Sequence, residues 1–166
     1  DGRAMDMKEK MREVKKKGLN IYMLLNKFKK DSKLKPEIPD EVIEKVAEEM
    51  KPILAEKKIY LKVDELTLGK LPKAWADKNR LKQVVYNLVG NAMKFTQEGG
   101  VTISSKISSK QIKISITDTG RGISPEAQQL LFRKFQQAGD SLITRDTTKG
   151  TGLGLYISKM IVENMG

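Results

Sequence analysis

Two amides and an amine are spaced helically near the middle of this 166-residue chain. Asn91 follows Asn87 by four residues and Lys94 follows Asn91 by three, so on a helix the three side chains lie on one side. An amide oxygen is a ligand for a hard cation, and an ammonium group neutralises phosphate. The spacing therefore suits a metal-bound phosphate. The plainer alternative is the polar face of a half-buried helix.

A carboxylate followed by two glycines stands directly after a predicted strand. Gly120 and Gly122 follow Asp118. Glycines permit a positive φ and a close approach of the backbone to a flat ligand. A carboxylate accepts hydrogen bonds from an exocyclic amine. The segment suits a flat ligand that carries an exocyclic amine, and the plainer alternative is a turn that leads to a helix cap at Ser124.

Three alternating glycines open the last predicted helix, where residues 150–155 read Gly-Thr-Gly-Leu-Gly-Leu. Backbone N–H groups at a helix N-terminus attract anions, and the helix dipole adds to that attraction. The segment is not a P-loop, because no Gly-Lys-Ser/Thr follows at the required spacing. It is not a dinucleotide fingerprint either, because a polar loop and not a strand precedes it.

The composition excludes several kinds of site. The chain has no Cys and no His, which excludes disulfide scaffolds, thiol nucleophiles, Cys-ligated zinc and Ser-His-Asp hydrolysis. No apolar run approaches the roughly 20 residues that span a bilayer, and no signal peptide opens the chain. We therefore expect a cytoplasmic chain with no membrane contact of its own, although a longer parent protein can be membrane-anchored.

The net charge of +11 is concentrated near the N-terminus. Residues 1–36 hold 12 Lys and Arg against 5 Asp and Glu, and the rest is nearly balanced. Aromatic residues do not alternate with the basic run, as a base-stacking surface requires. We therefore predict no nucleic-acid partner, and a basic coiled-coil nucleic-acid binder is the least favoured interpretation.

The N-terminal segment carries an apolar heptad, which predicts a long helix over residues 1–35. The 4-3 spacing of a coiled-coil seam runs through Met7, Met11, Val14, Gly18, Ile21, Leu25 and Phe28. A seam this narrow needs a partner helix. We favour pairing between two copies of the chain over docking on its own domain.

The remaining sequence predicts helices and antiparallel strands that do not alternate as βαβ units. Expected helices begin at an Asp40 cap, at an Asp77 cap, at Ser124 and near Thr151. The helix after Asp77 has a broad apolar stripe through about Phe95, and the helix after Ser124 runs to about Phe135. The last helix has its apolar residues at helical spacing: Leu153, Ile157, Met160, Ile161 and Met165. Expected strands are 58–63, 74–76, 101–107 and 112–116, the last two forming a hairpin. Residues 136–149 are polar and aperiodic, which predicts a loop. The fold class is therefore α+β, a two-layer α/β sandwich.

In order, these motifs resemble the nucleotide-binding boxes of sensor histidine kinases. Asn-x-x-x-Asn-x-x-Lys-Phe, Asp-x-Gly-x-Gly, Phe-x-x-Phe and Gly-Thr-Gly-Leu-Gly-Leu match the N, G1, F and G2 boxes. The resemblance covers about residues 34–166 and implies the Bergerat fold, a mixed, mostly antiparallel sheet against helices. It implies a catalytic domain at 36–166 that lacks its last strands, after a remnant of the dimerisation hairpin at 1–35.

The resemblance implies a role for each motif residue. Asp118 would bind the adenine amino group, Asn91 would ligate the Mg²⁺ that bridges the phosphates of ATP, and Lys94 would contact phosphate. Residues 136–149 would form a lid anchored by Phe132 and Phe135, for which core packing is the alternative. The other residues it assigns to the ATP site are Phe95, Gly120, Gly122, Ile123, Arg145, Lys149, Thr151, Gly152, Leu153 and Gly154.

Asn87 bears on the reaction type, and the resemblance makes it a catalytic residue with Asn91 and Lys94. In hydrolytic relatives this position is a Glu that activates water, and an amide cannot act as a general base. We therefore expect transfer of the γ-phosphoryl group to a histidine, which this His-free chain cannot supply itself. The implied partners are a histidine-bearing dimerisation domain, an acidic response-regulator receiver domain and a second copy bound through the N-terminal helix. The alternative is a nucleotide-binding regulatory or interaction module without phosphotransfer.

Overall fold

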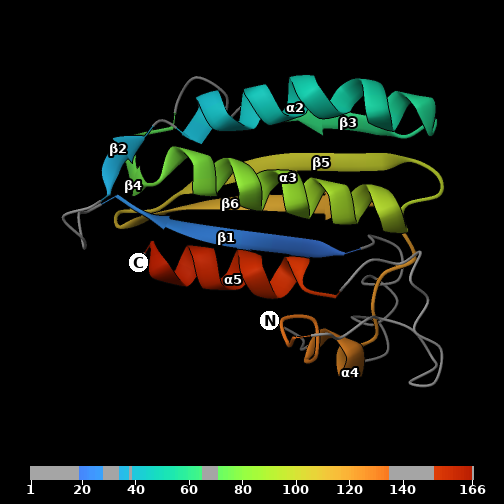
Figure 1. Cartoon of the computed structure of the whole chain (residues 1–166). Coiled ribbons are helices and arrows are strands. Elements are labelled where there is room, and N and C mark those ends of the chain that lie inside the picture. The colour runs from blue at the N-terminus through green and yellow to red at the C-terminus, as the bar shows by residue number, and fades with distance from the viewer. Residues whose placement is uncertain (1–18, 28–33, 38, 65–70, 135–151, 166) are drawn as a thin grey trace, which may run out of the picture.

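The computed structural model describes residues 19–27, 34–37, 39–64, 71–134 and 152–165. Its main sheet has the strand order β1-β6-β5-β3, in which β3 is parallel to β5 and the other pairs are antiparallel. The strands are β1 (Asn20–Asn26), β3 (Tyr60–Val63), β5 (Gly100–Ile107) and β6 (Gln111–Asp118). Helices α2 (Pro39–Glu56), α3 (Lys78–Phe95) and α5 (Gly154–Asn164) lie on the same face of this sheet (Figure 1). The predicted two-layer α/β sandwich with a mixed, mostly antiparallel sheet is confirmed.

The predicted hairpin forms β5 and β6. Alternate side chains of both strands are buried against the helices, and the turn closes through a 2.8 Å hydrogen bond from the Ser108 amide to the Gln111 carbonyl. A smaller sheet pairs β2 (Lys35–Glu37) with β4 (Ala74–Ala76). The hairpin register places Asp118 at the last position of β6, opposite Val101.

Helix α3 (Lys78–Phe95) packs on the sheet between α2 and α5. Asp77 caps it as predicted, because its Oδ1 accepts a 2.9 Å hydrogen bond from the Arg80 amide. The predicted apolar stripe is buried at Leu81, Val84, Val85, Leu88, Val89 and Ala92. This stripe fixes the rotation of α3 and so decides where its polar residues lie.

Helix α2 (Pro39–Glu56) also forms where the sequence predicts, with its apolar face buried. Asp40, however, lies inside the helix and is not its cap. The Asp40 carboxylate is buried, and its Oδ2 accepts a 3.1 Å hydrogen bond from the Leu71 amide. The side chain therefore ties the start of α2 to the segment before β4.

The predicted N-terminal helix is wrong for residues 20–26, which form β1 at the edge of the main sheet. Ile21 and Leu25 fit a helical seam, but residues four apart share a face of a strand as well. Met23 lies between them and is buried with Leu25, whereas Tyr22 and Leu24 are exposed, which is the alternation of a strand. Residues 20–26 therefore belong to the same sheet as β5 and β6 and not to a separate helical segment.

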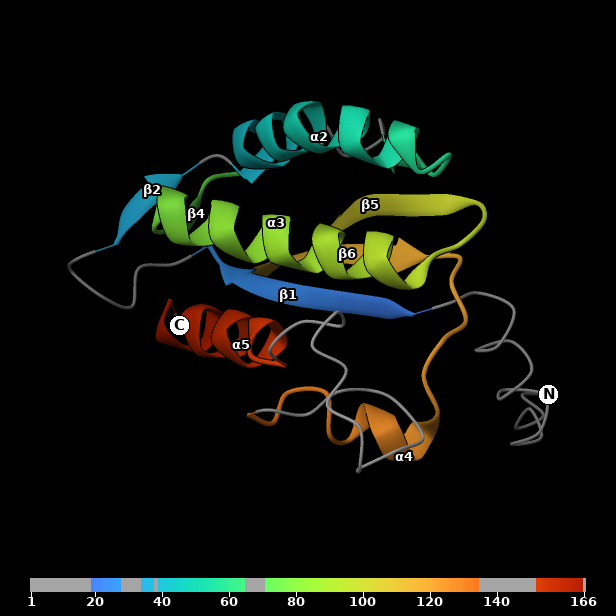
Figure 2. The ribbon, with the colours of Figure 1, turned by 45° about the vertical axis from the view of Figure 1, so that its right-hand side comes forward.

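The two C-terminal helices are shorter than predicted. Ser124 caps α4 (Pro125–Gln128) as expected, accepting a 3.2 Å hydrogen bond from the Ala127 amide. Helix α5 (Gly154–Asn164) packs against α3 and β1, and both ribbon views show it beside β1 (Figures 1 and 2). Ile157 on α5 is exposed, although its spacing predicts burial.

Several predictions fall outside the described residues. These are the heptad positions up to Gly18 and at Phe28, the lid at 136–149, and the site residues Phe135, Arg145, Lys149 and Thr151. Among the residues described, no helix combines the length and the apolar character that crossing a membrane requires.

Candidate functional site

A buried carboxylate ends strand β6. Asp118 is 4% exposed, and its Oδ1 accepts hydrogen bonds from the amides of Gly120 at 2.8 Å and Leu19 at 3.3 Å. Burial raises the pKa of Asp118 above its ordinary value of 3.8, and these two hydrogen bonds act in the opposite direction. The carboxylate is thus a fixed hydrogen-bond acceptor in a largely dry position.

The two glycines after Asp118 are needed for different physical reasons. A Cβ on Gly120 would lie 2.4 Å from the carbonyl oxygen of Phe95 and 2.8 Å from Asp118 Oδ1, which leaves no room for a side chain. Gly122 has a φ of +70°, a backbone conformation that L side chains rarely adopt. The glycines therefore bring the turn after β6 close to the end of α3.

The carboxylate lies on a small hollow between α3, the sheet and the first turn of α5. Of the predicted site residues, the hollow brings together Asn91, Phe95, Asp118, Gly122 and Ile123. Its other walls are apolar: Leu19, Ile21, Leu88, Ala92, Ile116, Leu131 and Leu155. The hollow thus combines apolar walls with one carboxylate and one amide. Binding sites for small ligands typically have this composition, in which a few polar groups orient the ligand.

The hollow at Asp118 is small, with a cavity volume of about 40 Å³. Pockets for small ligands typically measure about 300–1,000 Å³, so a ligand with an aromatic base requires side chains at the rim to move. A second hollow of about 550 Å³ adjoins the first and shares Leu19, Ile21, Leu88 and Leu131 with it. Leu131, one of these shared residues, is only partly buried.

Two cations lie near the aromatic wall of the hollow. Lys94 Nζ is 5.7 Å and the Arg121 guanidinium carbon is 5.6 Å from the centre of the Phe95 ring. Both distances are within the range of cation–π attraction. The described residues include no cluster of three or more acidic side chains that could hold a metal ion. A cation here would therefore depend on Asn91 and on oxygens of the ligand itself.

The glycine-rich segment leads into α5 beside this hollow. Gly152 has a φ of +69°, and no side chain caps the helix at Leu153 in the described residues. The first amides of an uncapped helix are donors available to an anion. Leu155, in the first turn of α5, lines the hollow with Asp118 and Asn91. Of this motif, Leu155 therefore reaches the hollow, whereas the predicted site residue Gly154 lines a different groove.

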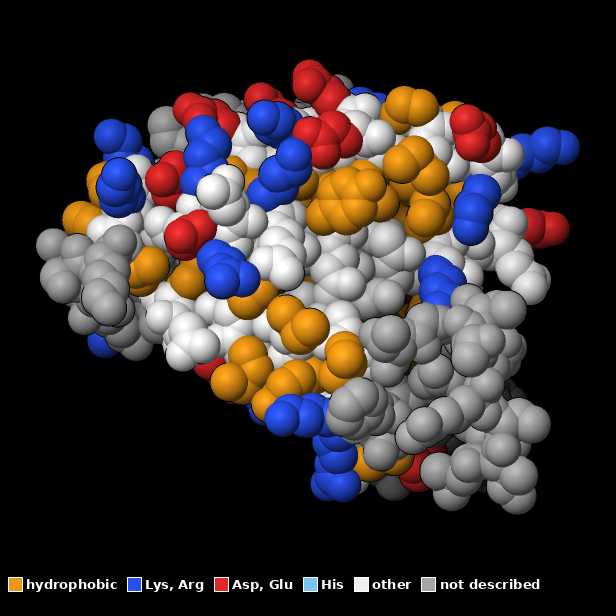
Figure 3. All heavy atoms as spheres, in the orientation of Figure 1, with side chains coloured by type: hydrophobic (Ala, Val, Ile, Leu, Met, Phe, Trp, Pro, Cys, Tyr) orange, Lys and Arg blue, Asp and Glu red, His pale blue; other side chains and the backbone are white. Residues whose placement is uncertain are grey.

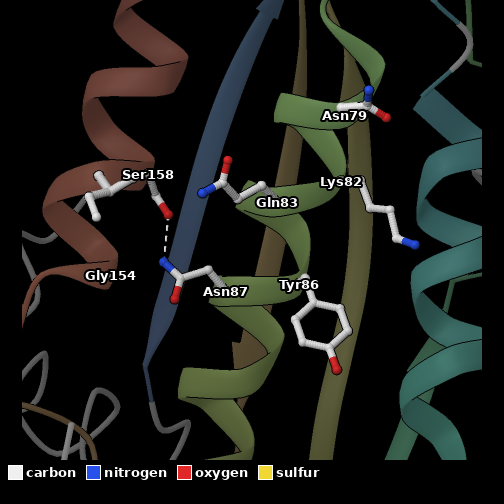
Figure 4. A pocket seen from close by; sticks show the side chains of 8 residues that line it. Asn79, Lys82, Gln83, Tyr86, Asn87, Gly154 and Ser158 are labelled. Carbon is white, nitrogen blue, oxygen red and sulfur yellow. Dashed lines mark hydrogen bonds between the residues drawn. The ribbon is translucent and has the colours of Figure 1, made fainter. Parts of the chain in front are cut away.

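Asn87, in contrast, is not among the residues that line the hollow at Asp118. It lies in an outer groove of about 550 Å³ between α3 and α5, whose described lining is Asn79, Lys82, Gln83, Tyr86, Asn87, Gly154, Ile157 and Ser158 (Figure 4). Asn87 Nδ2 donates a 2.7 Å hydrogen bond to Ser158 Oγ. Figure 3 shows exposed apolar side chains among charged ones on this helical face, and Tyr86 and Ile157 are exposed at the groove.

Some predicted and observed site residues differ. Phe132 is 37% exposed and lines the adjoining hollow, not the one that holds Asp118. Leu19 and Ile21 line the site, but the sequence assigned them to a helix and carries no motif that marks them. Leu155 was not predicted to line the site, although it belongs to the glycine-rich motif at residues 150–155, which marks it as a candidate.

Comparison with known proteins gives matches to one family. The profile of histidine kinase-, DNA gyrase B- and HSP90-like ATPases matches residues 76–166. The chain is 46% identical over 95 residues to the sensor histidine kinase GacS of Pseudomonas protegens, which covers 54% of the chain and 10% of that protein. It is 43% identical over 98 residues to the signal transduction histidine-protein kinase BarA of Escherichia coli, with coverage of 54% and 10%. The chain thus spans about a tenth of the length of these relatives.

Solved structures show the same likeness over more of the chain. Full-length ShkA in complex with AMPPNP matches with a TM-score of 0.66 and 33% identity, covering 80% of this chain and 26% of that one. The catalytic domain of the histidine kinase ThkA matches with a TM-score of 0.61 and 27% identity, covering 80% and 82%. The predicted resemblance to the catalytic domains of sensor histidine kinases is confirmed.

Proposed function

Since the chain belongs to the family of histidine kinase-, DNA gyrase B- and HSP90-like ATPases, we propose that it binds ATP with Mg²⁺ at Asp118. We propose further that it acts as the catalytic domain of a two-component sensor histidine kinase. The observation that carries the proposal is the meeting of Asp118, Asn91 and Phe95 in one apolar-walled hollow. The match to ShkA, solved with AMPPNP, supports the nucleotide.

Base recognition is assigned to the inner part of the hollow. Asp118 is held by two backbone amides through Oδ1, so its carboxylate is oriented before a ligand arrives. It would accept a hydrogen bond from the exocyclic amine of adenine. Phe95 and Ile123 would flank the base with apolar surface. The rim side chain Leu131 would have to move, since the free volume is small.

Phosphate and metal binding are assigned to the part of the hollow between α3 and α5. Asn91 offers an amide oxygen to Mg²⁺, which neutralises phosphate charge when it is bound. Lys94 and the uncapped first turn of α5 would interact with the phosphates. The donor set fits a cation held largely by the nucleotide and water, which is how Mg²⁺ usually binds.

Phosphoryl transfer is the chemistry we propose for the bound nucleotide. A neutral imidazole nitrogen forms a bond to the γ-phosphorus while the bond to the β–γ bridging oxygen breaks, and ADP leaves. The protein contributes positioning and charge neutralisation. The chain has no His, so the acceptor lies on a histidine-bearing dimerisation domain, with an acidic receiver domain as the next partner. We do not propose the predicted helical homodimer, because residues 20–26 of its seam form β1.

Calorimetric titration of the chain with ATP in Mg²⁺ tests the binding step. Asp118→Ala should weaken binding at least about tenfold, since a hydrogen bond to a charged group is worth about 1.5–3 kcal/mol. Glu44→Ala, an exposed acid on α2, is the matched control and should bind like the parent chain. Equal affinity of a folded Asp118→Ala variant would contradict the proposed site.

A phosphotransfer assay distinguishes a kinase from a nucleotide-binding regulatory module that transfers no phosphate. The chain is incubated with Mg²⁺-ATP and a separately prepared histidine-bearing dimerisation domain, and acid-labile phosphate on that domain is measured. Transfer that is lost in Asn91→Ala supports the kinase. Intact ATP binding with no transfer to any such domain favours the nucleotide-binding module without phosphotransfer.

A further inference from the structure

A side-chain hydrogen bond joins α3 to α5 outside the hollow at Asp118. The donor is Asn87 Nδ2 and the acceptor is Ser158 Oγ, 2.7 Å away (Figure 4). Ser158 is 4% exposed, so the bond is largely shielded from water on the α5 side. If the Asn87 amide were removed, the buried Ser158 hydroxyl would lose this hydrogen-bond partner. A buried polar group without a partner lowers the stability of the folded chain.

The same amide lies against the beginning of α5. A Cβ on Gly154 would be 2.6 Å from Asn87 Oδ1, 3.0 Å from Nδ2 and 3.1 Å from Cγ. Gly154 is not among the glycines with positive φ, so its backbone conformation does not require glycine. A side chain at position 154 would therefore meet the Asn87 amide, which would have to shift. The amide thus spans one full turn of α5, from Gly154 to Ser158.

The first turn of α5 borders both the groove and the hollow. Gly154 lines the groove with Asn87, while the next residue, Leu155, lines the hollow with Asn91 and Asp118. A shift of this turn away from α3 would therefore move Leu155 and the first amides of α5 relative to the hollow. The cap residue Leu153 makes no side-chain hydrogen bond to α5, and the Asn87 amide lies against Gly154 and is bonded to Ser158 across this turn.

We infer that Asn87 is a positioning residue, which holds the first turn of α5 at the nucleotide site through Ser158 and Gly154 and does not bind the nucleotide or its metal. The inference rests on the proposed function, since it says how one wall of that same site is held. It differs from the role that motif spacing suggests for Asn87, which is direct contact with the metal-bound phosphates.

A double-mutant cycle on ATP affinity, measured by calorimetry with and without Mg²⁺, distinguishes the two roles. Asn87→Ala and Ser158→Ala should each weaken ATP binding about two- to tenfold, as loss of one neutral hydrogen bond predicts. The double variant should bind no more weakly than either single variant, because both changes break one link. The strengthening of ATP binding by Mg²⁺ should persist in all three.

The control is Gln83→Ala, one turn earlier on α3 in the same groove, which should leave ATP affinity unchanged. Direct metal contact by Asn87 makes a different prediction. In that case Asn87→Ala removes the effect of Mg²⁺ while Ser158→Ala leaves binding unchanged, and this pair of results would overturn the inference.

Gly154→Ala gives a test by rescue. The added Cβ should weaken ATP binding of the parent chain, because it meets the Asn87 amide. In the Asn87→Ala background the same change should cost no affinity, because the side chain that it meets is gone. Equal loss in both backgrounds would contradict the assigned contact.

Hydrogen exchange of the nucleotide-free chain keeps this test independent of the proposed function. Asn87→Ala and Ser158→Ala should both speed exchange of the hydrogen-bonded amides of α5 from Ile157 onward and leave those of β5 and β6 unchanged. If the parent chain fails to bind ATP, the proposed function fails, while the exchange data still decide whether Asn87 holds α5. Unchanged exchange at α5 in both variants would overturn the inference.

Discussion

Asn87 and Asn91 are one turn apart on α3, yet they border different spaces. Asn91 lines the small hollow with the buried carboxylate of Asp118. Asn87 lines the outer groove and donates its hydrogen bond to Ser158 on α5. Their spacing places both on one side of the helix, but the packing of α5 against that side separates them. Identical residues in one motif can therefore have different physical roles, and the neighbouring helix decides which.

The two spaces also differ in what closes them. Among the described residues, β1 lines the hollow at Asp118 but not the groove at Asn87. The Leu19 amide, just before β1, donates directly to Asp118. The candidate nucleotide site therefore depends on a strand far away in the sequence, whereas the groove depends on two helices.

The largest effect that we expect comes from the packing of β1. Leu25 is 1% exposed and Leu24 is 38% exposed, so their side chains point to opposite faces of the strand. Leu25→Ala should lower the free energy of unfolding by about 2–5 kcal/mol, and Leu24→Ala by less than about 1 kcal/mol. Denaturant unfolding of both variants measures the difference. Equal effects would contradict the strand, and with it the role of β1 in closing the hollow.

A smaller effect is the difference in stability that we expect between Gly120→Ala and Gly154→Ala. A Cβ on Gly120 meets the backbone of Phe95, whereas a Cβ on Gly154 meets the end of the Asn87 side chain, which can move. Gly120→Ala should therefore cost about 1–3 kcal/mol of unfolding free energy, the usual cost of overpacking. Gly154→Ala should cost less, because Ala also favours the helix. Chemical denaturation of the two variants ranks them, and the reverse order would count against the geometry at both glycines.

The smallest effect is the pH dependence that Asp118 confers on stability. Burial raises its pKa above 3.8, so the folded chain binds this proton more tightly than the unfolded chain. The stability that the group contributes is present below pH 3.8 and is lost as the pH rises through the raised pKa. Asp118→Asn keeps an acceptor oxygen but does not ionise.

Relative to the parent chain, Asp118→Asn should therefore gain stability as the pH rises from 3.5 to 7. Urea unfolding at several pH values measures this difference. A stability difference for Asp118→Asn that is constant across the range would mean that burial does not control this carboxyl.

Local sequence signals predicted the parts of the molecule that local physics determines. The Asp77 cap and the apolar stripe of α3 form as expected, and the hairpin alternation places Asp118 at the end of a strand. The order of the motifs identified the family, and with it the fold. The cap, the stripe and the hairpin each depend on residues that are near one another in the sequence.

The parts that depend on distant contacts could not be predicted in the same way. Ile21 and Leu25 satisfy helical and strand periodicity alike, and only pairing with β6 decides between the two. The hydrogen bond from Asn87 joins residues 71 positions apart, so spacing on α3 alone could not reveal Ser158 as its partner. Leu19 became a site residue for the same reason, through its pairing beside Asp118.

The most direct measurement is the effect of Mg²⁺ on ATP affinity in Asn91→Ala and Asn87→Ala, compared with the parent chain. Asn91→Ala should weaken Mg²⁺-ATP binding about tenfold or more and should leave the weaker binding of metal-free ATP little changed. Asn87→Ala should weaken both forms by a similar, smaller factor. If both variants lose the effect of Mg²⁺ equally, the two amides act on the same bound metal, and the distinction between the hollow and the groove is wrong.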